Sequence, residues 1–111
     1  YNGGRDPDAA EPMLYMIHGI DADDSLPRRA SARDAHLGRL KALANEGRLI
    51  LAGPLPAIDA EDPGPTGFTG SLVVAEFESL DKARAWADED PYLQVGAWTR
   101  ADVRPFKRVL P

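Results

Sequence analysis

His36 is the residue of this sequence whose chemistry most needs an explanation, because it interrupts a helical pattern of apolar and charged side chains. On a helix with about 100° per residue, Arg33 falls about 60° and Arg29 about 20° from His36, so all three share one face. An imidazole exchanges protons near neutral pH. With Arg33 one turn away, this face suits a pocket for a small polar or anionic ligand.

The same face also has an ordinary structural explanation. Leu40 and Leu43 continue it toward the C-terminal end of the helix, at about 40° and about −20° from His36. If the N-terminal half of the helix extends beyond the sheet, the two arginines only lay their aliphatic stems on apolar surface. His36 would then be a residue at the edge of the core. Periodicity alone does not choose between these two explanations.

Two further motifs carry modest signals. Gly53-Pro54 follows a short apolar run, where a glycine allows close approach of the backbone to another group or simply forms a turn. Asp90-Pro91-Tyr92 ends a helix, because the residue before a proline is driven out of the helical region. Asp90 could serve only to accept hydrogen bonds from nearby backbone N–H groups. Neither motif identifies a site by itself.

The composition excludes several classes of function. The chain of 111 residues has no cysteine, which rules out disulfides, thiol nucleophiles and thiolate metal sites. Its 13 basic and 18 acidic residues give a net charge of −5, which argues against a nucleic-acid partner. Two histidines on separate elements and no HExxH pair argue against a metal or haem site, so we expect no cofactor. No run approaches the roughly 20 apolar residues of a membrane span and no leader pattern is visible, so we expect a cytoplasmic protein without membrane contact.

Hydrophobic periodicity and turn residues predict alternating strands and helices. We expect strands at 13–20, 48–52, 70–78 and 97–109, helices at 26–46 and 80–89, a loop at 56–67 and a compact turn at 90–96. This βαββαβ order predicts a ferredoxin-like α+β fold, in which a four-stranded antiparallel sheet carries both helices on one face. Residues 13–111 would form this single domain, and we expect residues 1–12 to be an appended remnant or a disordered extension.

The second face of such a sheet would be bare. The strands at 13–20 and 70–78 are too continuously apolar for one side to remain in water. Face-to-face packing of two sheets is the simplest way to cover that side. We therefore expect a homodimer formed through the open sheet face, which a larger assembly could incorporate.

Several ordered motifs carry a resemblance to a known family. They are Ser31 to Leu37 (SARDAHL), Glu46 to Leu49 (EGRL), Ala52 to Pro54 (AGP), Gly67 to Ser71 (GFTGS), Ala75 to Ser79 (AEFES), Ala85 to Asp88 (AWAD), Asp90 to Tyr92 (DPY) with Gly96, and Arg104 to Phe106 (RPF). With these motifs, the run from Leu14 to Val109 resembles the YciI family of YCII-related proteins. The resemblance implies a dimeric α+β barrel with an active site built on a histidine–aspartate dyad. By position in the motifs, the histidine is His36 and the aspartate is Asp90.

The resemblance also implies acid–base chemistry. Asp90 would hold the imidazole of His36 in one tautomer, so that the other ring nitrogen could take a proton from substrate. Arg33 and Arg29 could stabilise a developing enolate or phenolate. The family's likeness to muconolactone-isomerase-like and dehydrochlorinase-like barrels favours proton abstraction on a small, often cyclic molecule, by an isomerase or a lyase. Asp34 is a poorer partner, because a residue two positions from His36 points away from it.

The expected site has six further residues that would contact substrate. They are Arg29, Arg33, Gly53, Pro54, Ser71 and Tyr92. A ligand-binding or interaction module with the same pocket and no catalysis is the alternative. His18 is more often a packed strand residue than a catalytic one, and we expect it to support the pocket from outside. Trp86, Trp98 and Phe106 are expected in the core or the dimer interface.

Overall fold

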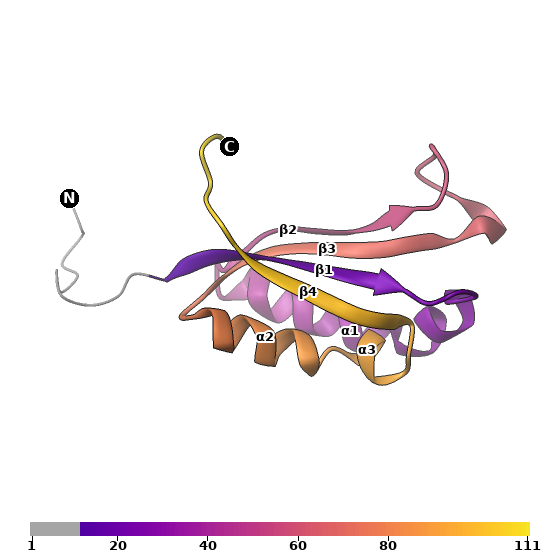
Figure 1. Cartoon of the computed structure of the whole chain (residues 1–111), viewed down its shortest axis with the longest axis horizontal. Coiled ribbons are helices and arrows are strands. Elements are labelled where there is room, and N and C mark those ends of the chain that lie inside the picture. The colour runs from indigo at the N-terminus through magenta and orange to yellow at the C-terminus, as the bar shows by residue number, and fades with distance from the viewer. Residues whose placement is uncertain (1–11) are drawn as a thin grey trace, which may run out of the picture.

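Four strands form one antiparallel sheet in the order β2-β3-β1-β4 in the computed structural model, which describes residues 12–111 (Figure 1). The elements are β1 (Met13–Asp21), α1 (Leu26–Asn45), β2 (Leu49–Pro56), a 3-10 helix at Gly64–Thr66, β3 (Phe68–Phe77), α2 (Leu80–Asp88), α3 (Pro91–Gln94) and β4 (Trp98–Phe106). This is the ferredoxin-like α+β topology that the sequence predicts. Residues 1–11, and with them nearly all of the predicted extension, lie outside the described residues.

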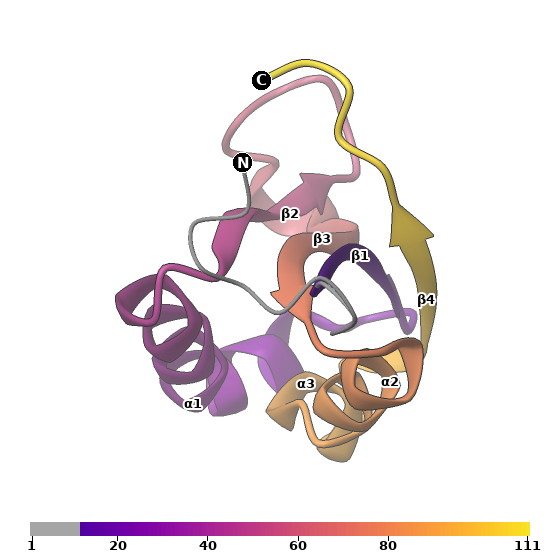
Figure 2. The same ribbon diagram turned by 90° about the vertical axis from the view of Figure 1, so that its left-hand side faces the viewer.

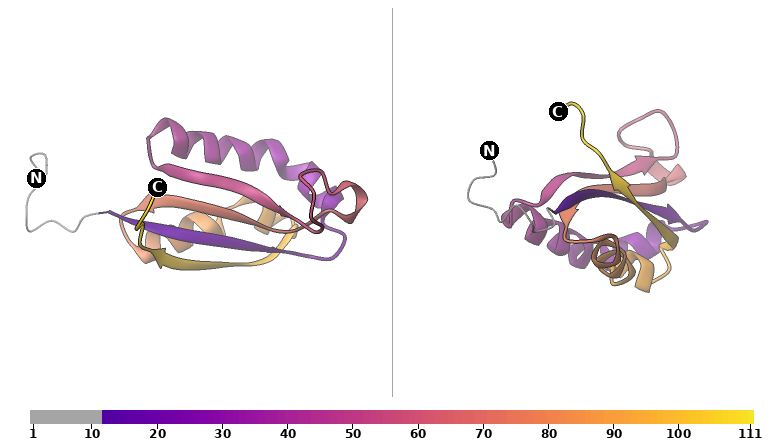
Figure 3. Two further views of the ribbon diagram at one scale, coloured as in Figure 1. Left: turned by 90° about the horizontal axis from the view of Figure 1, so that it is seen from above. Right: turned by 60° about the vertical axis from the view of Figure 1, so that its left-hand side comes forward.

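The helices α1, α2 and α3 cover one face of the sheet (Figures 1 and 2). Seen from above, α1 runs along the β2 side, whereas α2 and α3 contact the β4 side (Figure 3). On the opposite face the sheet is open to view, and the β2–β3 loop and the C-terminal segment extend toward that side (Figure 2). Within residues 12–111, none of the helices is both long and apolar enough to cross a membrane.

The ends of the helices follow local signals in the sequence. Gly47, with a φ of 73°, takes the left-handed conformation that ends α1, and glycine adopts it without a Cβ clash. The Ser79 side chain accepts a hydrogen bond of 3.1 Å from the Lys82 backbone N–H and begins α2. Asp90 begins α3 in the same way, by accepting from the Tyr92 N–H at 2.9 Å. The two caps place α2 and α3 in direct succession.

The core lies between the helices and the sheet. Its fully or nearly buried members are Tyr15, Ile17, Leu40, Leu43, Val73, Ala75, Phe77, Ala83 and Ala87. Alternation along β1 puts Tyr15 and Ile17 on the helix side, whereas Met16 and His18 face the open side and are only half-buried. A smaller cluster of Ala32, Tyr92, Ala97 and Trp98 extends the core under the N-terminal half of α1.

The ends of two strands differ most from the prediction, by three or four residues. β2 does not end at Gly53-Pro54 but continues to Pro56, and Pro54 pairs with Ser71 of β3. Because β2 is an edge strand, a proline without an N–H is tolerated there. β4 ends at Phe106 rather than at residue 109, because its partner in the register is Leu14, near the start of β1. The predicted loop at 56–67 and turn at 90–96 each contain one short helix.

Gly19 lets β4 approach β1 beneath the α1 helix. A Cβ atom on Gly19 would lie 2.2 Å from Cε2 of the Trp98 ring, which is far inside van der Waals contact. Trp98 is 1% exposed, so its indole has no free space to move into. The glycine is therefore required for the position of an indole that packs beside His36.

We expect Gly19→Ala to destabilise the protein by about 1–3 kcal/mol, because the added methyl group overpacks the core at Trp98. Gly38→Ala is the matched control, because a Cβ atom on Gly38, inside α1, would have no neighbour within 4 Å. There the alanine should stabilise the helix by about 0.5–1 kcal/mol. Urea denaturation of the three proteins measures both effects, and equal midpoints for Gly19→Ala and wild type would contradict the packing argument.

Candidate functional site

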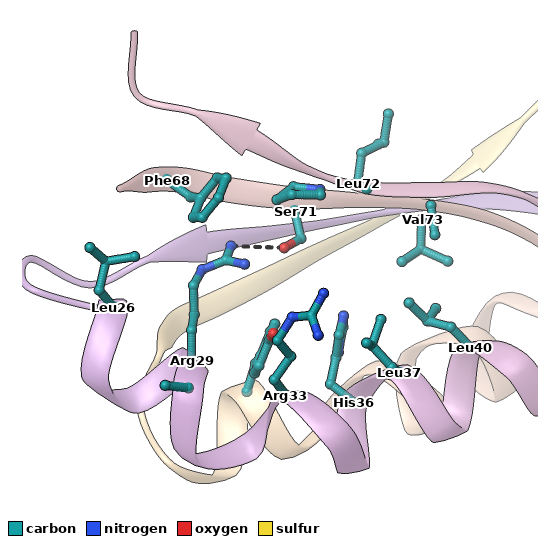
Figure 4. Close-up of a pocket in the computed structure, with 15 residues that line it drawn as sticks. Leu26, Arg29, Arg33, His36, Leu37, Leu40, Phe68, Ser71, Leu72 and Val73 are labelled. Atoms are coloured by element: carbon teal, nitrogen blue, oxygen red, sulfur yellow. Dashed lines mark hydrogen bonds between the residues drawn. The ribbon is translucent and has the colours of Figure 1, made fainter. Parts of the chain in front are cut away.

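A pocket of about 360 Å³ lies between α1 and the β2–β3 half of the sheet, within the range of small-molecule sites. Seven of the eight predicted site residues line it: Arg29, Arg33, His36, Gly53, Pro54, Ser71 and Tyr92. The rest of the wall is apolar, formed by Leu26, Ala30, Leu37, Leu40, Ala52, Phe68, Leu72 and Val73. Figure 4 shows Arg29, Arg33 and His36 projecting from α1 toward β3. Asp90 does not line the pocket.

Asp90 lies directly behind His36. Nδ1 of His36 is 2.9 Å from Oδ1 and 3.0 Å from Oδ2 of the Asp90 carboxyl group. Asp90 is 0% exposed and His36 is 5% exposed, so the pair is shielded from bulk water. An ionised carboxylate can only accept, so Nδ1 of His36 carries the hydrogen and Nε2 of the neutral ring is the basic atom.

A backbone donor and a nearby positive charge complete the surroundings of the Asp90 carboxylate. The Tyr92 N–H donates to Oδ1 at 2.9 Å, and Nη1 of Arg39 lies 3.5 Å from Oδ2. Arg39 is itself held by Trp86, because Nη2 donates to the Trp86 carbonyl at 2.7 Å and the guanidinium lies 4.2 Å from the ring centroid. Burial lowers the pKa of Arg39, while the charges of Asp90 and Glu89 raise it. The buried carboxylate is thus compensated on three sides.

The imidazole packs against two aromatic rings that also contact each other. It stacks on Tyr92 with ring centroids 3.9 Å apart and an interplanar angle of 13°, and it meets the edge of Trp98 at 5.6 Å. Burial raises the pKa of the Tyr92 phenol, although the charges of Arg29 and Arg33 oppose the shift. The phenol therefore remains a hydrogen-bond donor at neutral pH.

Arg29 is neither free in the pocket nor extended into solvent. Its Nε lies 2.7 Å from Oδ2 and its Nη2 2.8 Å from Oδ1 of Asp21, which makes a bidentate ion pair. Nη2 also donates to the Gly70 carbonyl and to the Ser71 hydroxyl, both at 2.9 Å. Arg29 as a residue is 7% exposed, and Nε and Nη2 of its guanidinium are engaged by these partners. Its contribution to the pocket is to tie α1 to the ends of β1 and β3.

Arg33 differs from Arg29 in every one of these respects. It is exposed, and its guanidinium reaches into the pocket beside the His36 ring (Figure 4). From the sheet, Gly53 and Pro54 complete the rim as part of the edge strand β2. Arg33 and His36 are therefore the charged and basic groups that a ligand would meet first.

The expectation that His18 supports the pocket is wrong. His18 is absent from the pocket wall, and in the register of β1 it pairs with Asp102 of β4. Because neighbours along a strand alternate between faces, His18 lies on the open side while Ile17 lies in the core. Both faces of β1 are apolar, which left the direction of His18 undetermined in the sequence.

Two residues of the site were missed by the sequence analysis. Asp21 falls just outside the predicted strand at 13–20 and was not singled out, although an acidic residue eight positions before Arg29 at a strand end was an available signal. Arg39 follows His36 by three positions on the same helix, and this spacing was the signal for it. Among residues 12–111, no group of three or more histidine, aspartate and glutamate side chains has the arrangement of a metal site.

Comparison with known proteins gives matches along nearly the whole described chain. The family model of the YCII-related domain matches residues 13–107. Protein YciI of Escherichia coli and that of Shigella flexneri are each 58% identical over 97 residues, which is 87% of this chain and 99% of the relative.

A solved structure shares the fold. The 5-chloro-2-hydroxyhydroquinone dehydrochlorinase of Burkholderia phenoliruptrix, in complex with 2,5-dihydroxybenzoquinone, superposes with a TM-score of 0.74. The two chains are 27% identical, and the match covers 86% of this chain and 94% of the other.

We expect Arg29→Gln to lower the free energy of unfolding by about 3–5 kcal/mol, because it leaves the buried Asp21 carboxylate without its counter-charge. Arg33→Gln, on the same helix face but exposed, should change it by no more than about 0.5 kcal/mol. Urea denaturation monitored by tryptophan fluorescence compares the two variants. Equal losses would show that the two arginines do not differ in structural role.

Proposed function

The chain belongs to the family of YCII-related domains, and from this premise we propose that it is an acid–base enzyme acting on a small, often cyclic, polar or anionic substrate. His36 would be the base and Asp90 the group that orients and charge-compensates it. The observation that carries the proposal is the buried contact of 2.9 Å between His36 Nδ1 and Asp90 Oδ1 at the wall of a pocket. A buried carboxylate paired with a pocket-lining imidazole is a pattern of catalytic bases.

The reaction class follows from what a single base can do. Nε2 of His36 takes a proton from a carbon or hydroxyl next to a carbonyl, and the electron pair of the broken bond forms an enolate or phenolate. The proton then returns to another atom in an isomerisation, or a leaving group departs with its bonding pair in an elimination. Asp90 stabilises the imidazolium formed meanwhile, and such a base contributes about 10²- to 10⁴-fold in rate.

The solved relative supports a ring-shaped substrate. It is a dehydrochlorinase of a hydroxylated aromatic ring and was solved with a flat quinone bound. In this chain, the apolar wall formed by Leu26, Leu40 and Phe68 offers a surface on which a ring could pack. We therefore propose a lyase or isomerase on a small cyclic molecule as the first class to assay.

We also propose that the protein acts as a homodimer in the cytoplasm. On the open face, Met16 of β1 pairs with Val74 of β3, and Val74 pairs with Leu51 of the edge strand β2. Leu51 is 50% exposed, so an apolar row of three strands ends at an uncovered leucine. A second sheet packed on this face would cover the exposed end of that row at Leu51. The absence of cysteine suits a reducing compartment.

His36→Ala and Asp90→Asn should each lower kcat/KM by about 10²- to 10⁴-fold, because the first removes the base and the second its orienting carboxylate. Substrates come from a thermal-shift screen of small metabolites that includes 5-chloro-2-hydroxyhydroquinone. Circular dichroism checks that the variants are folded. If a metabolite stabilises the wild type without turnover, and stabilises Asp90→Asn equally, the protein is a binding module and the enzyme proposal is overturned.

Leu51→Asp should convert a wild-type dimer into a monomer, because it places a charge in the middle of the apolar row. Val95→Asp is the matched control, since Val95 is 41% exposed but follows α3 on the helix side. Sedimentation velocity at several concentrations gives the mass of each protein. A monomeric wild type, or a dimer that survives Leu51→Asp, would contradict an interface on this face.

A further inference from the structure

The charges around the pocket are paired, with one exception. Three arginines of α1 surround His36: Arg29, Arg33 and Arg39. Arg29 is neutralised by Asp21, with contacts of 2.7 and 2.8 Å, and Arg39 lies 3.5 Å from the carboxylate of Asp90. Each of these cations therefore faces a buried anion of the protein itself. A ligand would therefore have to compete with an internal carboxylate for either of them.

Arg33 is the exception. Within residues 12–111, the structure gives its guanidinium no carboxylate partner and no side-chain hydrogen bond. It lies three residues before His36, and its guanidinium points into the pocket beside the imidazole (Figure 4). A planar fork of N–H donors in that position matches a carboxylate or an ionised enol or phenol oxygen.

We propose that the pocket selects a singly charged organic anion, whose charged group binds Arg33 while Arg29 takes no part in recognition. The inference rests on the proposed function, because it assumes that the His36 pocket is the substrate site. It narrows that function from any polar or anionic molecule to monoanions. It also assigns the discrimination between ligands to Arg33 rather than to Arg29, although both arginines share the helix face.

The remaining polar groups of the pocket agree with a single charge. Besides Arg33, a ligand meets the imidazole of His36 and the phenol of Tyr92, which are a base and a neutral donor. Arg29 and Arg39 already face the buried carboxylates of Asp21 and Asp90, so neither arginine supplies a second free counter-charge. A dianion such as a phosphate monoester would therefore have one charge without a counter-ion.

The rest of the ligand must be apolar and small. Phe68 and Val73 of β3 lie across the pocket from Arg33 and His36, and Leu26, Leu37 and Leu40 line it from α1 itself. Hydrophobic contact with these side chains holds the body of the ligand, and Arg33 orients it by its charged end. The charged group would thus lie within one helical turn of the base.

Three probes of one ring size test the charge rule: benzoate as a monoanion, benzamide as its uncharged isostere, and phenyl phosphate as a dianion. Titration calorimetry of the wild type should show benzoate binding at least about tenfold more tightly than benzamide or phenyl phosphate. Arg33→Gln should abolish this preference, and Arg33→Lys should retain part of it. Lys41→Gln, which removes a charge from an exposed position of the same helix, should bind all three as the wild type does.

The proposal is overturned if benzoate and benzamide bind the wild type equally, if phenyl phosphate binds best, or if benzoate does not bind up to about 10 mM. It is also overturned if Arg33→Gln keeps the preference for benzoate. Failure of the enzyme proposal can be told apart from failure of the charge rule. A preference for benzoate that depends on Arg33 should persist in His36→Ala, whether or not the wild type turns over any substrate.

Discussion

The site depends on the burial of one carboxylate. Asp90 is 0% exposed, and an ionised group at such depth is tolerated only when donors surround it. Its partners come from separate elements, because the imidazole of His36 and the guanidinium of Arg39 lie on α1 and the N–H of Tyr92 lies on α3. To satisfy Asp90, the chain must bring α1 and α3 together. That same approach stacks Tyr92 on His36 and fixes the plane of the imidazole.

The pocket also depends on a second buried ion pair, between Arg29 and Asp21. The bidentate contact between Arg29 and Asp21 ties the N-terminal half of α1 to the end of β1, and the hydrogen bonds to Gly70 and Ser71 tie it to β3. Apolar packing holds the other half of the helix to the core. The pocket lies where the helix passes from polar to apolar attachment. This change of attachment explains why the helix face begins with arginines and ends with leucines.

Periodicity was sufficient to predict the main strands and helices and the helix face that carries Arg29, Arg33 and His36. It did not predict which residues of other elements contact that face. The 3.6-residue repeat placed Arg29, Arg33 and His36 together, because that relation is local. Asp90 is 54 positions from His36, so only the family resemblance could suggest the pair. Arg29 and Asp21 are only eight positions apart, but they lie on different elements. Their ion pair requires the end of a strand to meet the start of a helix, which periodicity does not predict. His18 shows the converse limit: a strand that is apolar on both faces does not reveal which face a polar residue takes.

The proposed ligand pocket and the proposed dimer interface lie on opposite faces of the sheet. β3 contributes Val73 to the pocket on the helix side, whereas Val74, its neighbour in sequence, belongs to the apolar row on the open side. The chain as a whole carries a net charge of −5, yet the one unpaired cation of the pocket is Arg33 among the described residues. A local positive site on an acidic protein acts at short range, so the proposed selection of ligands would depend on contact with the guanidinium rather than on long-range attraction.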